Sequence, residues 1–125
     1  MDSRAYTIDG KLPGLNEYTR ACRTNRYSGA KFKRDAHALI IPQLRDKRPF
    51  PTPCTVHLEW YEANNKRDVD NIEFAQKFVL DCLVETGIIP DDSRRHVTLT
   101  THGIAVDKKR PRVVVTLICN GCDSA

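Results

Sequence analysis

The chain contains no apolar run that approaches ~18 residues, the length a membrane-spanning helix needs. No apolar segment follows the N-terminal methionine, so we expect no signal peptide. Internal repeats and low-complexity segments are also missing. What remains is a chain of 125 residues, 40% hydrophobic and 29% charged. These values are typical of a single globular domain, and we expect one domain over residues 1–125.

The sequence also lacks a second pair of closely spaced cysteines. Cys119 and Cys122 have the spacing of zinc ligands, but nothing completes a tetrahedral site. The total of five cysteines is odd. Together with the missing export signal, this predicts reduced thiols and a cytoplasmic protein. We expect residues 118–125 to form a flexible tail and assign no role to its two thiols.

Acidic residues are absent from residues 18–34, although the whole chain has 16 acidic residues against 20 lysines and arginines. Basic stripes of this kind attract phosphates and release counterions when they bind nucleic acid. A single basic cluster is also what an ordinary solvated face contains. Several such clusters around one acidic centre favour DNA binding, and the candidate backbone contacts are Arg20, Arg23, Arg26, Lys31, Lys33, Lys66 and Arg67.

Hydrophobic periodicity predicts four strands and two main helices. The strands are expected at residues 5–8, 54–61, 97–106 and 112–119, and the helices at residues 30–44 and 71–86. Pro42 should end the first helix early. The last two strands are expected to form a hairpin through the basic turn between them. The order β-α-β-α-β-β predicts an α+β fold, with helices on one face of a small mixed sheet.

Four carboxylates flank the second predicted helix: Asp68 and Asp70 at its start, Asp91 and Asp92 beyond its end. In an extended approach to the helix, Asp68 and Asp70 point to the same side and repel each other unless a cation bridges them. Mg²⁺ suits such a pair, because it takes oxygen ligands and fills its shell with water and substrate phosphate. We therefore expect the chain to bring all four carboxylates to one magnesium ion.

Two further side chains extend this hypothesis. Lys77 lies on one helical stripe with Asp70, Glu73 and Asp81, and it can stabilise charge that develops on a scissile phosphate. The metal would lower the pKa of a bound water. Asn71 can orient a metal-binding carboxylate as a hydrogen-bond donor. The expected catalytic residues are thus Asp68, Asp70, Asp92 and Lys77.

The same residues also have a purely structural explanation. Asp70 is placed to cap the helix, and Glu73 then completes a capping box. Glu73 and Lys77 form an i,i+4 pair, while Asp91 and Asp92 fit a turn. The four histidines are isolated in the sequence. A structural or solvent-facing role fits them better than metal ligation.

These motifs resemble the RusA-type Holliday junction resolvases of bacteria and their phages. The resemblance rests on Lys66-Arg67-Asp68-Val69-Asp70-Asn71-Ile72, on Lys77-Phe78-Val79-Leu80-Asp81-Cys82-Leu83, and on Gly87 with Asp91-Asp92. The loop Gly10-Lys11-Leu12-Pro13-Gly14-Leu15-Asn16-Glu17 is also similar to the loop after the first strand in that family. Together these segments span most of the chain, from about Ala5 to Leu117.

The resemblance implies a homodimeric crossover junction endodeoxyribonuclease that nicks two opposed strands of a four-way DNA junction. Such enzymes serve DNA recombination and repair, depend on Mg²⁺ (with Mn²⁺ as a substitute), and come from bacteria, prophages or phages. Asp68 and Asp70 match the paired aspartates of the family, Asp92 matches the third, and Asp91 is its neighbour. Lys77 matches the family lysine when three extra residues, within Ile72 to Gln76, are allowed between Asn71 and Lys77.

Two alternatives remain at this stage. Instead of a junction resolvase, the chain could be a non-catalytic module that binds branched or single-stranded DNA through its basic face. It could also be a nuclease that acts on forks or flaps. The first alternative predicts salt-sensitive binding without nicking. The second predicts cleavage of forks rather than four-way junctions.

Overall fold

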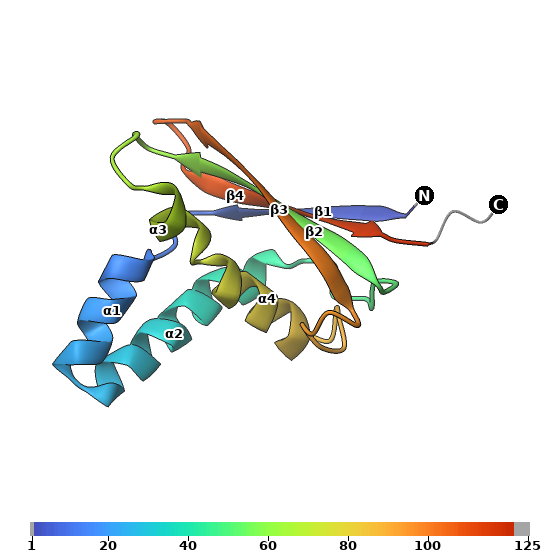
Figure 1. Ribbon diagram of the computed structural model, residues 1–125, viewed down its shortest axis with the longest axis horizontal. Helices are drawn as coiled ribbons and strands as arrows, with labels where there is room; N and C mark the ends of the chain where they lie inside the picture. The colour runs from blue at the N-terminus through green and yellow to red at the C-terminus, as the bar shows by residue number, and fades with distance from the viewer. Residues whose placement is uncertain (1, 122–125) are drawn as a thin grey trace.

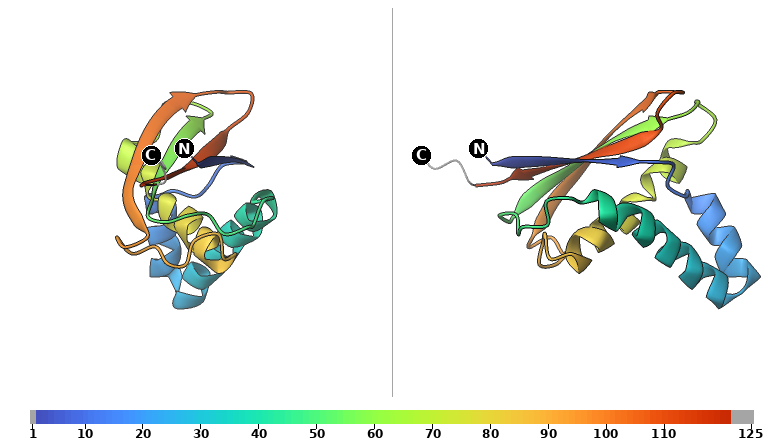
Figure 2. Two further views of the ribbon diagram at one scale, coloured as in Figure 1. Left: turned by 90° about the vertical axis from the view of Figure 1, so that its right-hand side faces the viewer. Right: turned by 180° about the vertical axis from the view of Figure 1, so that it is seen from behind.

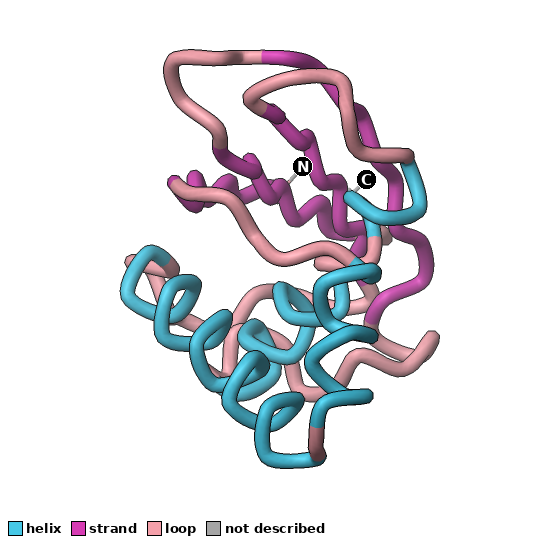
Figure 3. The backbone as a smooth tube through the Cα atoms, turned by 90° about the vertical axis from the view of Figure 1, so that its left-hand side faces the viewer, coloured by secondary structure: helices cyan, strands magenta, loops and turns pink. Residues whose placement is uncertain are grey.

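Within residues 2–121, the helices all cover one face of a single β-sheet, and the other face carries no helix (Figures 1 and 2). The computed structural model describes residues 2–121, apart from the side chain of Arg26. Figure 3 shows the same layers as a tube, with the long helices below the strands and a short helical segment beside them. This arrangement confirms the predicted α+β class and the small mixed sheet.

The sheet has four strands in the order β1-β4-β2-β3. Their bounds are β1 Ser3–Asp9, β2 Cys54–Glu62, β3 Val97–Val106 and β4 Arg112–Cys119. β4 is antiparallel to both β1 and β2, whereas β2 and β3 are parallel. The four predicted strands are therefore present, and β1 and β3 form the two edges.

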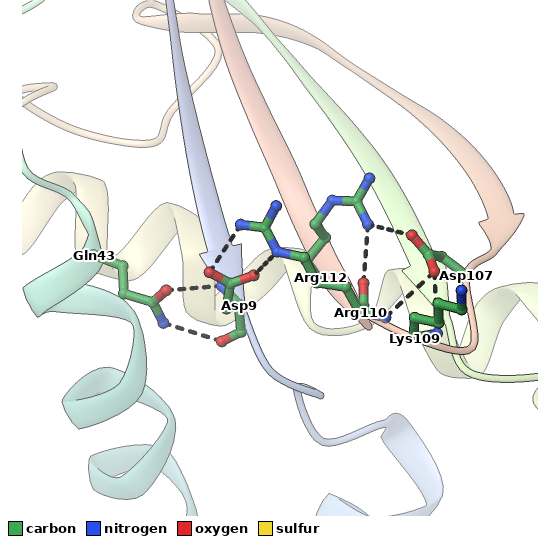
Figure 4. A network of polar contacts seen from close by, with 6 residues as sticks. All are labelled: Asp9, Gln43, Asp107, Lys109, Arg110 and Arg112. Atoms are coloured by element: carbon green, nitrogen blue, oxygen red, sulfur yellow. Dashed lines mark hydrogen bonds and ion pairs between the residues drawn. The ribbon is translucent and has the colours of Figure 1, made fainter.

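The predicted hairpin between β3 and β4 is wrong, because β2 lies between these two strands. The segment from β2 to β3 is a β-α-β crossover, and strands joined in this way pair side by side in parallel. The chain must then pass across the end of β2 to reach β4. Ion pairs hold this crossing turn in place (Figure 4). The Arg110 Nε lies 2.6 Å from Asp9 Oδ1, and the Arg112 Nη1 lies 2.8 Å from Asp107 Oδ2.

Two consecutive helices follow β1 and project away from the sheet as a helical hairpin (Figures 1 and 2). They are α1 Leu15–Thr24 and α2 Arg26–Ile40. Asn25 separates them, and its side chain accepts a hydrogen bond from the Ser28 N–H at 2.8 Å, which caps α2. Pro42 ends the α-helix as predicted, within the short 3₁₀ turn η1 Ile41–Gln43. The sequence did not predict α1, and α1 buries none of its residues.

The second helical segment is two helices rather than the single helix expected over residues 71–86. They are α3 Val69–Glu73 and α4 Gln76–Glu85, with a break at Phe74 and Ala75. At the break the hydrogen bonds tighten to i,i+3 spacing: Ala75 N–H bonds to Ile72 at 3.2 Å, and Phe78 N–H to Ala75 at 3.0 Å. The break falls inside the stretch where the family resemblance requires extra residues.

The hydrophobic core lies between the helices and one face of the sheet. Alternate residues of β2 and β4 are buried there, while their neighbours on the open face stay half-buried. Phe78 of α4 is fully buried in this layer. The Tyr18 ring of α1 lies 5.4 Å from Phe74 and 5.8 Å from Phe78, measured between centroids. These aromatic contacts fasten the helical hairpin to the break between α3 and α4.

The C-terminal part of the chain differs from the predicted tail. β4 continues through Cys119, so residues 118 and 119 belong to the sheet. Cys119 is disulfide-bonded, contrary to the expectation of reduced thiols, whereas Cys22, Cys54 and Cys82 are free. Cys122 and the end of the predicted tail lie outside the described residues. Over residues 2–121, no helix has the length and apolar character required to cross a membrane.

Candidate active site

Asp68 and Asp70 stand together at the start of α3, directly after the loop that leaves β2. Asp68 occupies the N-cap position with extended backbone, but its carboxylate makes no capping hydrogen bond. Asp70 lies in the first turn, where its Oδ1 accepts the Asn71 N–H at 3.0 Å. The N-cap is thus Asp68 rather than the predicted Asp70, and its side chain does not cap the helix. Both carboxylates are exposed to solvent.

Arg67 holds this acidic turn against the end of β2. Its Nε donates to Glu62 Oε1 at 2.8 Å and its Nη2 donates to Glu62 Oε2 at 3.0 Å. Only 12% of the Arg67 side chain and 11% of the Glu62 side chain are exposed. Nη1 also donates to the carbonyl of Leu12 at 3.3 Å. Because the Arg67 guanidinium points inward and binds Glu62 and Leu12, the prediction that it contacts DNA is wrong.

Asn71 ties the acidic turn to the loop before α1. Its Oδ1 accepts the N–H of Asn16 at 3.0 Å. Gly14 packs against the same place, since a Cβ there would lie 2.9 Å from the Arg67 guanidinium and closer still to Asn71. Only glycine fits such a close approach. Asn71 therefore fixes the loop through its amide oxygen, and the role of its NH₂ group as a donor to a carboxylate stays a prediction.

Asp91 and Asp92 lie in the loop between α4 and β3, at the other end of the sheet (Figure 1). That loop bonds to the start of β2 and to the segment before it: the Phe50 N–H donates to the Ile88 carbonyl at 2.8 Å, and the Cys54 N–H donates to the His96 carbonyl at 2.9 Å. Both aspartates are exposed. A hydrogen bond from the Ser93 side chain is the main cause that lowers the pKa of Asp91. The length of β2, roughly 27 Å, separates the two acidic pairs.

A single chain thus does not bring the four carboxylates together, and the prediction that one chain gathers them around one magnesium ion is wrong. Among residues 2–121, no group of three or more His, Cys, Asp and Glu side chains is placed to hold a metal ion. The reason is the β-α-β crossover, because a helix linking two parallel strands begins at one end of the sheet and finishes at the other. Asp68 and Asp70 remain as two carboxylates, a set that suits Mg²⁺ with waters and substrate phosphate.

The stripe of charged residues expected along one helix is interrupted by the break between α3 and α4. Lys77 is exposed in the first turn of α4, beyond the break. Glu73 faces His102 of β3, with 4.0 Å between Oε1 and Nε2. Asp81 pairs with Lys33 of α2 at 3.7 Å. Glu73 and Asp81 therefore have partners on other elements, whereas Lys77, like Asp70, faces solvent.

Arginines of α1 line a groove that begins beside the acidic turn. The groove has a volume of about 510 Å³ and is lined by Leu15, Asn16, Thr19, Arg20, Arg23 and Thr24. Asn16 is the residue bonded to Asn71, so the first turn of α1 touches the start of α3. A strand of DNA lying along α1 would meet two guanidinium groups and then the two carboxylates. This juxtaposition supports Arg20 and Arg23 as phosphate contacts.

The other predicted phosphate contacts differ in whether an acidic side chain already pairs with them. Lys31 pairs with Asp35 at 2.8 Å and Lys33 with Asp81 at 3.7 Å. Lys66 is exposed in the loop before the acidic turn. The side chain of Arg26 lies outside the described part of the chain. Lys66 is thus the basic residue closest in sequence to Asp68 that stays open to solvent.

A histidine that the sequence did not single out lies next to this region. His102 stacks on Trp60, and the indole Nε1–H donates to His102 Nδ1 at 3.0 Å. The ring proton of neutral His102 is therefore on Nε2, the nitrogen that faces Glu73. Burial lowers the pKa of His102 and favours this neutral form. Periodicity gave no signal for it, because the contact depends on the parallel pairing of β2 and β3.

The sequence matches the family model described as Endodeoxyribonuclease RusA over residues 15–118. A comparison with curated proteins found no match. Membership of this family implies Holliday junction resolvase nuclease activity, with a DNA junction as substrate. Nucleases of this family are generally dependent on divalent metal ions. Because the match covers most of the chain, the protein belongs to the RusA family of endodeoxyribonucleases.

Proposed function

We propose that this protein is a Mg²⁺-dependent homodimeric endonuclease that resolves four-way DNA junctions by symmetric nicks in two opposed strands. The observation that carries the proposal is the pair of exposed carboxylates, Asp68 and Asp70, in a turn that is hydrogen-bonded through Asn71 to the groove lined by Arg20 and Arg23. The groove suits a DNA backbone, and the carboxylates suit a hard cation. No sequence preference at the cut is proposed.

Asp68 and Asp70 are the residues that would hold Mg²⁺, with Mn²⁺ as a substitute. The bound ion would lower the pKa of a water and neutralise charge on the scissile phosphate. Arg20 and Arg23 would bind the flanking phosphates and orient the strand. Lys77, which is exposed, would stabilise the negative charge that grows on the phosphate oxygens.

The opposite placement of the two acidic pairs supports the dimer. If Asp92 contributes to the reaction, it must act on a site whose Asp68 and Asp70 belong to another copy, because roughly 27 Å of strand separates them within one chain. Two chains running in opposite directions would give two identical composite sites. A two-fold protein also suits a substrate whose two cut strands are related by a two-fold axis.

The catalytic assignment is tested with Asp70→Asn on a labelled four-way junction. We expect this variant to bind the junction at least as tightly as the wild type and to lose cleavage in Mg²⁺ by about 100-fold or more. Asp35→Asn is the matched control, since Asp35 is an exposed aspartate on α2. EDTA should stop wild-type cleavage. Normal cleavage by Asp70→Asn would show that this carboxylate is not catalytic.

The composite site is tested by mixing two inactive variants, Asp70→Asn and Asp92→Asn. In a mixed dimer, one site combines the intact Asp70 of one chain with the intact Asp92 of the other. We expect the mixture to recover single nicks, while each variant alone stays inactive. If the mixture is as inactive as its components, the two aspartates do not meet across subunits.

Substrate selectivity is tested by comparing a junction, a fork and a plain duplex at equal concentration. We expect cleavage of the junction to dominate. Equal cutting of plain duplex would contradict the proposed junction preference. Salt-sensitive binding without any nicking in Mg²⁺ or Mn²⁺ would instead identify a DNA-binding module.

A further inference from the structure

The helical hairpin of α1 and α2 carries an aromatic ring at its tip, the turn of residues 24–27 that joins the two helices. Tyr27 is 72% exposed, more than any other large hydrophobic side chain in residues 2–121, and the others in that exposed group are aliphatic. Figures 1 and 2 show the tip at the end of the hairpin that lies away from the sheet. Single exposed hydrophobic side chains are common on protein surfaces, so the setting of Tyr27 decides whether it has a role.

Short-range contacts hold the backbone around Tyr27. One residue separates α1 from α2, and the Thr24 hydroxyl donates to the Arg20 carbonyl at 3.1 Å at the end of α1. The two helices approach each other closely, since a Cβ on Gly29 would lie 2.8 Å from Cys22 Sγ. Tyr27 thus stands in the first turn of a helix that α1 supports. A partner that binds its ring has little backbone to immobilise, which lowers the entropic cost of binding.

Charge indicates DNA as the partner of the tip. Residues 18–34, which include the tip, contain no acidic residue, and Arg20 and Arg23 on the α1 side are both exposed. An acidic peptide bound along these arginines would be repelled by the nearby carboxylates of Asp68 and Asp70. A DNA phosphate can join the same carboxylates through a shared cation. DNA therefore fits this surface better than an acidic protein segment does.

α1 connects the tip to the candidate active site. Its first turn contacts the acidic turn, because the Asn16 N–H donates to Asn71 Oδ1 at 3.0 Å. The groove on α1 extends from there to Thr24 at the tip. The ten residues of α1 span about 15 Å, so a strand bound at the carboxylates and lying along this groove reaches Tyr27 a few nucleotides away. The ring and the carboxylates are thus placed to contact one DNA molecule.

A tyrosine ring binds a nucleic-acid base by stacking on its face, with little preference for which base it meets. In continuous duplex, neighbouring base pairs already cover both faces of each base. At the branch of a junction the base stack is interrupted, so a base face is exposed there at a lower cost in unstacking. An exposed ring at the tip therefore suits a branch and finds no equivalent partner in the middle of a duplex arm.

We propose that Tyr27 stacks on a base exposed at the branch point, so that the hairpin tip distinguishes branched DNA from continuous duplex. This inference rests on the proposed function, since it names the feature of the DNA that the groove on α1 presents to the same protein. The ring of Tyr27 supplies the contact, and its hydroxyl group is not required.

The stacking contact is tested by fluorescence anisotropy in EDTA, where no DNA is cut. We expect Tyr27→Ala to weaken binding of a four-way junction about 10-fold and to leave binding of plain duplex unchanged. Tyr27→Phe should bind the junction like the wild type. Leu39→Ala is the matched control, because it removes an exposed apolar side chain near the other end of α2.

Three results in this assay would overturn the inference. Tyr27→Phe as weak as Tyr27→Ala would assign the contact to the hydroxyl group. An equal loss of junction and duplex binding by Tyr27→Ala would show that the ring does not distinguish the branch, or that the variant is misfolded and the two losses share that cause. For this reason a second measurement uses the unaltered chain, and a wild type that binds junction and duplex equally well would also contradict the inference.

The second measurement is photochemical cross-linking with 5-iodouracil, which couples to an aromatic ring in direct contact with the base. The label is placed either at the branch of the junction or in the middle of one arm. We expect the wild type to cross-link to the branch label, with the coupled residue identified as Tyr27 by mass spectrometry. Cross-linking through another residue, or equal cross-linking from the arm, would rule out the stacking contact whatever Tyr27→Ala does.

These readouts separate the branch contact from the nuclease. A wild type that cross-links to the branch through Tyr27 supports the inference even if it never nicks DNA in Mg²⁺, in which case only the proposed function fails. Symmetric cleavage of the junction together with full junction affinity in Tyr27→Ala counts against the branch contact alone.

Discussion

Arg67 and Glu62 form a two-pronged ion pair that fastens the acidic turn to the last residue of β2, with N–O distances of 2.8 and 3.0 Å. Both side chains are nearly buried, at 12% and 11% exposure. A guanidinium matches both carboxylate oxygens at once, which an ammonium does not. The direction of the turn, and with it the placement of Asp68, therefore depends on arginine rather than on positive charge alone.

Replacing Arg67 with lysine should lower the free energy of unfolding by about 1.5–3 kcal/mol, the value of one charge-assisted hydrogen bond. Urea denaturation measures the change. Arg48→Lys is the matched control, because Arg48 contacts both oxygens of Asp46 in the same way but is 81% exposed. We expect that control to change stability by less than about 0.5 kcal/mol. Equal losses at the two positions would contradict a special role for the Arg67 pair.

Removal of Arg20 and Arg23 together should weaken junction binding and its salt dependence. If each guanidinium contacts one phosphate, Arg20→Ala with Arg23→Ala reduces the slope of log K against log salt by about 1.8. Fluorescence anisotropy over a series of salt concentrations measures this slope. Arg45→Ala with Arg48→Ala removes the same charge near the β1 edge and should leave the slope nearly unchanged. The same slope for both pairs would show that α1 does not bind the backbone.

The fluorescence of Trp60, the one tryptophan in the sequence, should report protonation of His102. Burial lowers the pKa of His102 from 6.5, so the unfolded chain binds this proton more readily than the folded chain. The contribution of neutral His102 to the free energy of unfolding is therefore complete above the pKa of histidine in the unfolded chain. It is lost as the pH falls from that value toward the lower pKa of His102 in the folded protein. Protonation also removes the acceptor for the indole N–H.

Trp60 emission should therefore change in the folded protein at a pH below 6.5. The change should disappear in His102→Gln, and urea denaturation should show that the wild type loses more stability than this variant on acidification. An emission curve that is the same in the variant and the wild type would assign the change to another group.

Thiol reagents should distinguish the free cysteines by burial. Burial raises the pKa of Cys82 to about 12, so its reactive thiolate is scarce at pH 8. Cys54 is also buried and its pKa is raised, whereas Cys22 is exposed. We expect Cys22 to react first with a chromogenic disulfide reagent, and Cys54 and Cys82 to react only after unfolding. Cys22→Ser should reduce the fast phase, and an unchanged fast phase would contradict this order.

The sequence predicted the helices and strands better than it predicted which strands pair in the sheet. Alternation along β2 and the apolar face of α4 are strong local signals, because each element buries one face in the same core. The helix α1 gave a weak signal, since it is held by Tyr18 and by contacts with α2 and α3 rather than by a buried stripe. The pairing of β3 with β2 instead of β4 depends on the whole crossover, which periodicity does not report.

The candidate site shows the same division. The identities of Asp68 and Asp70 and their nearness to basic residues follow from the sequence, because they are neighbours in the chain. The distance to Asp92 does not, since it depends on which end of the sheet the α4–β3 loop reaches. The inward direction of Arg67 was missed for a similar reason. Its partner Glu62 is buried at the end of β2, where the other buried side chains of the strand are apolar. The alternation along β2 therefore gave no sign that a carboxylate lies there to bind Arg67.

The placement of Asp70 and Asp92 at opposite ends of β2 has a consequence for how cleavage would depend on protein concentration. In the composite site proposed above, a lone chain would hold half of each reaction centre and would leave DNA uncut. Below the dissociation constant of the proposed dimer, the cleavage rate would therefore rise with the square of the protein concentration.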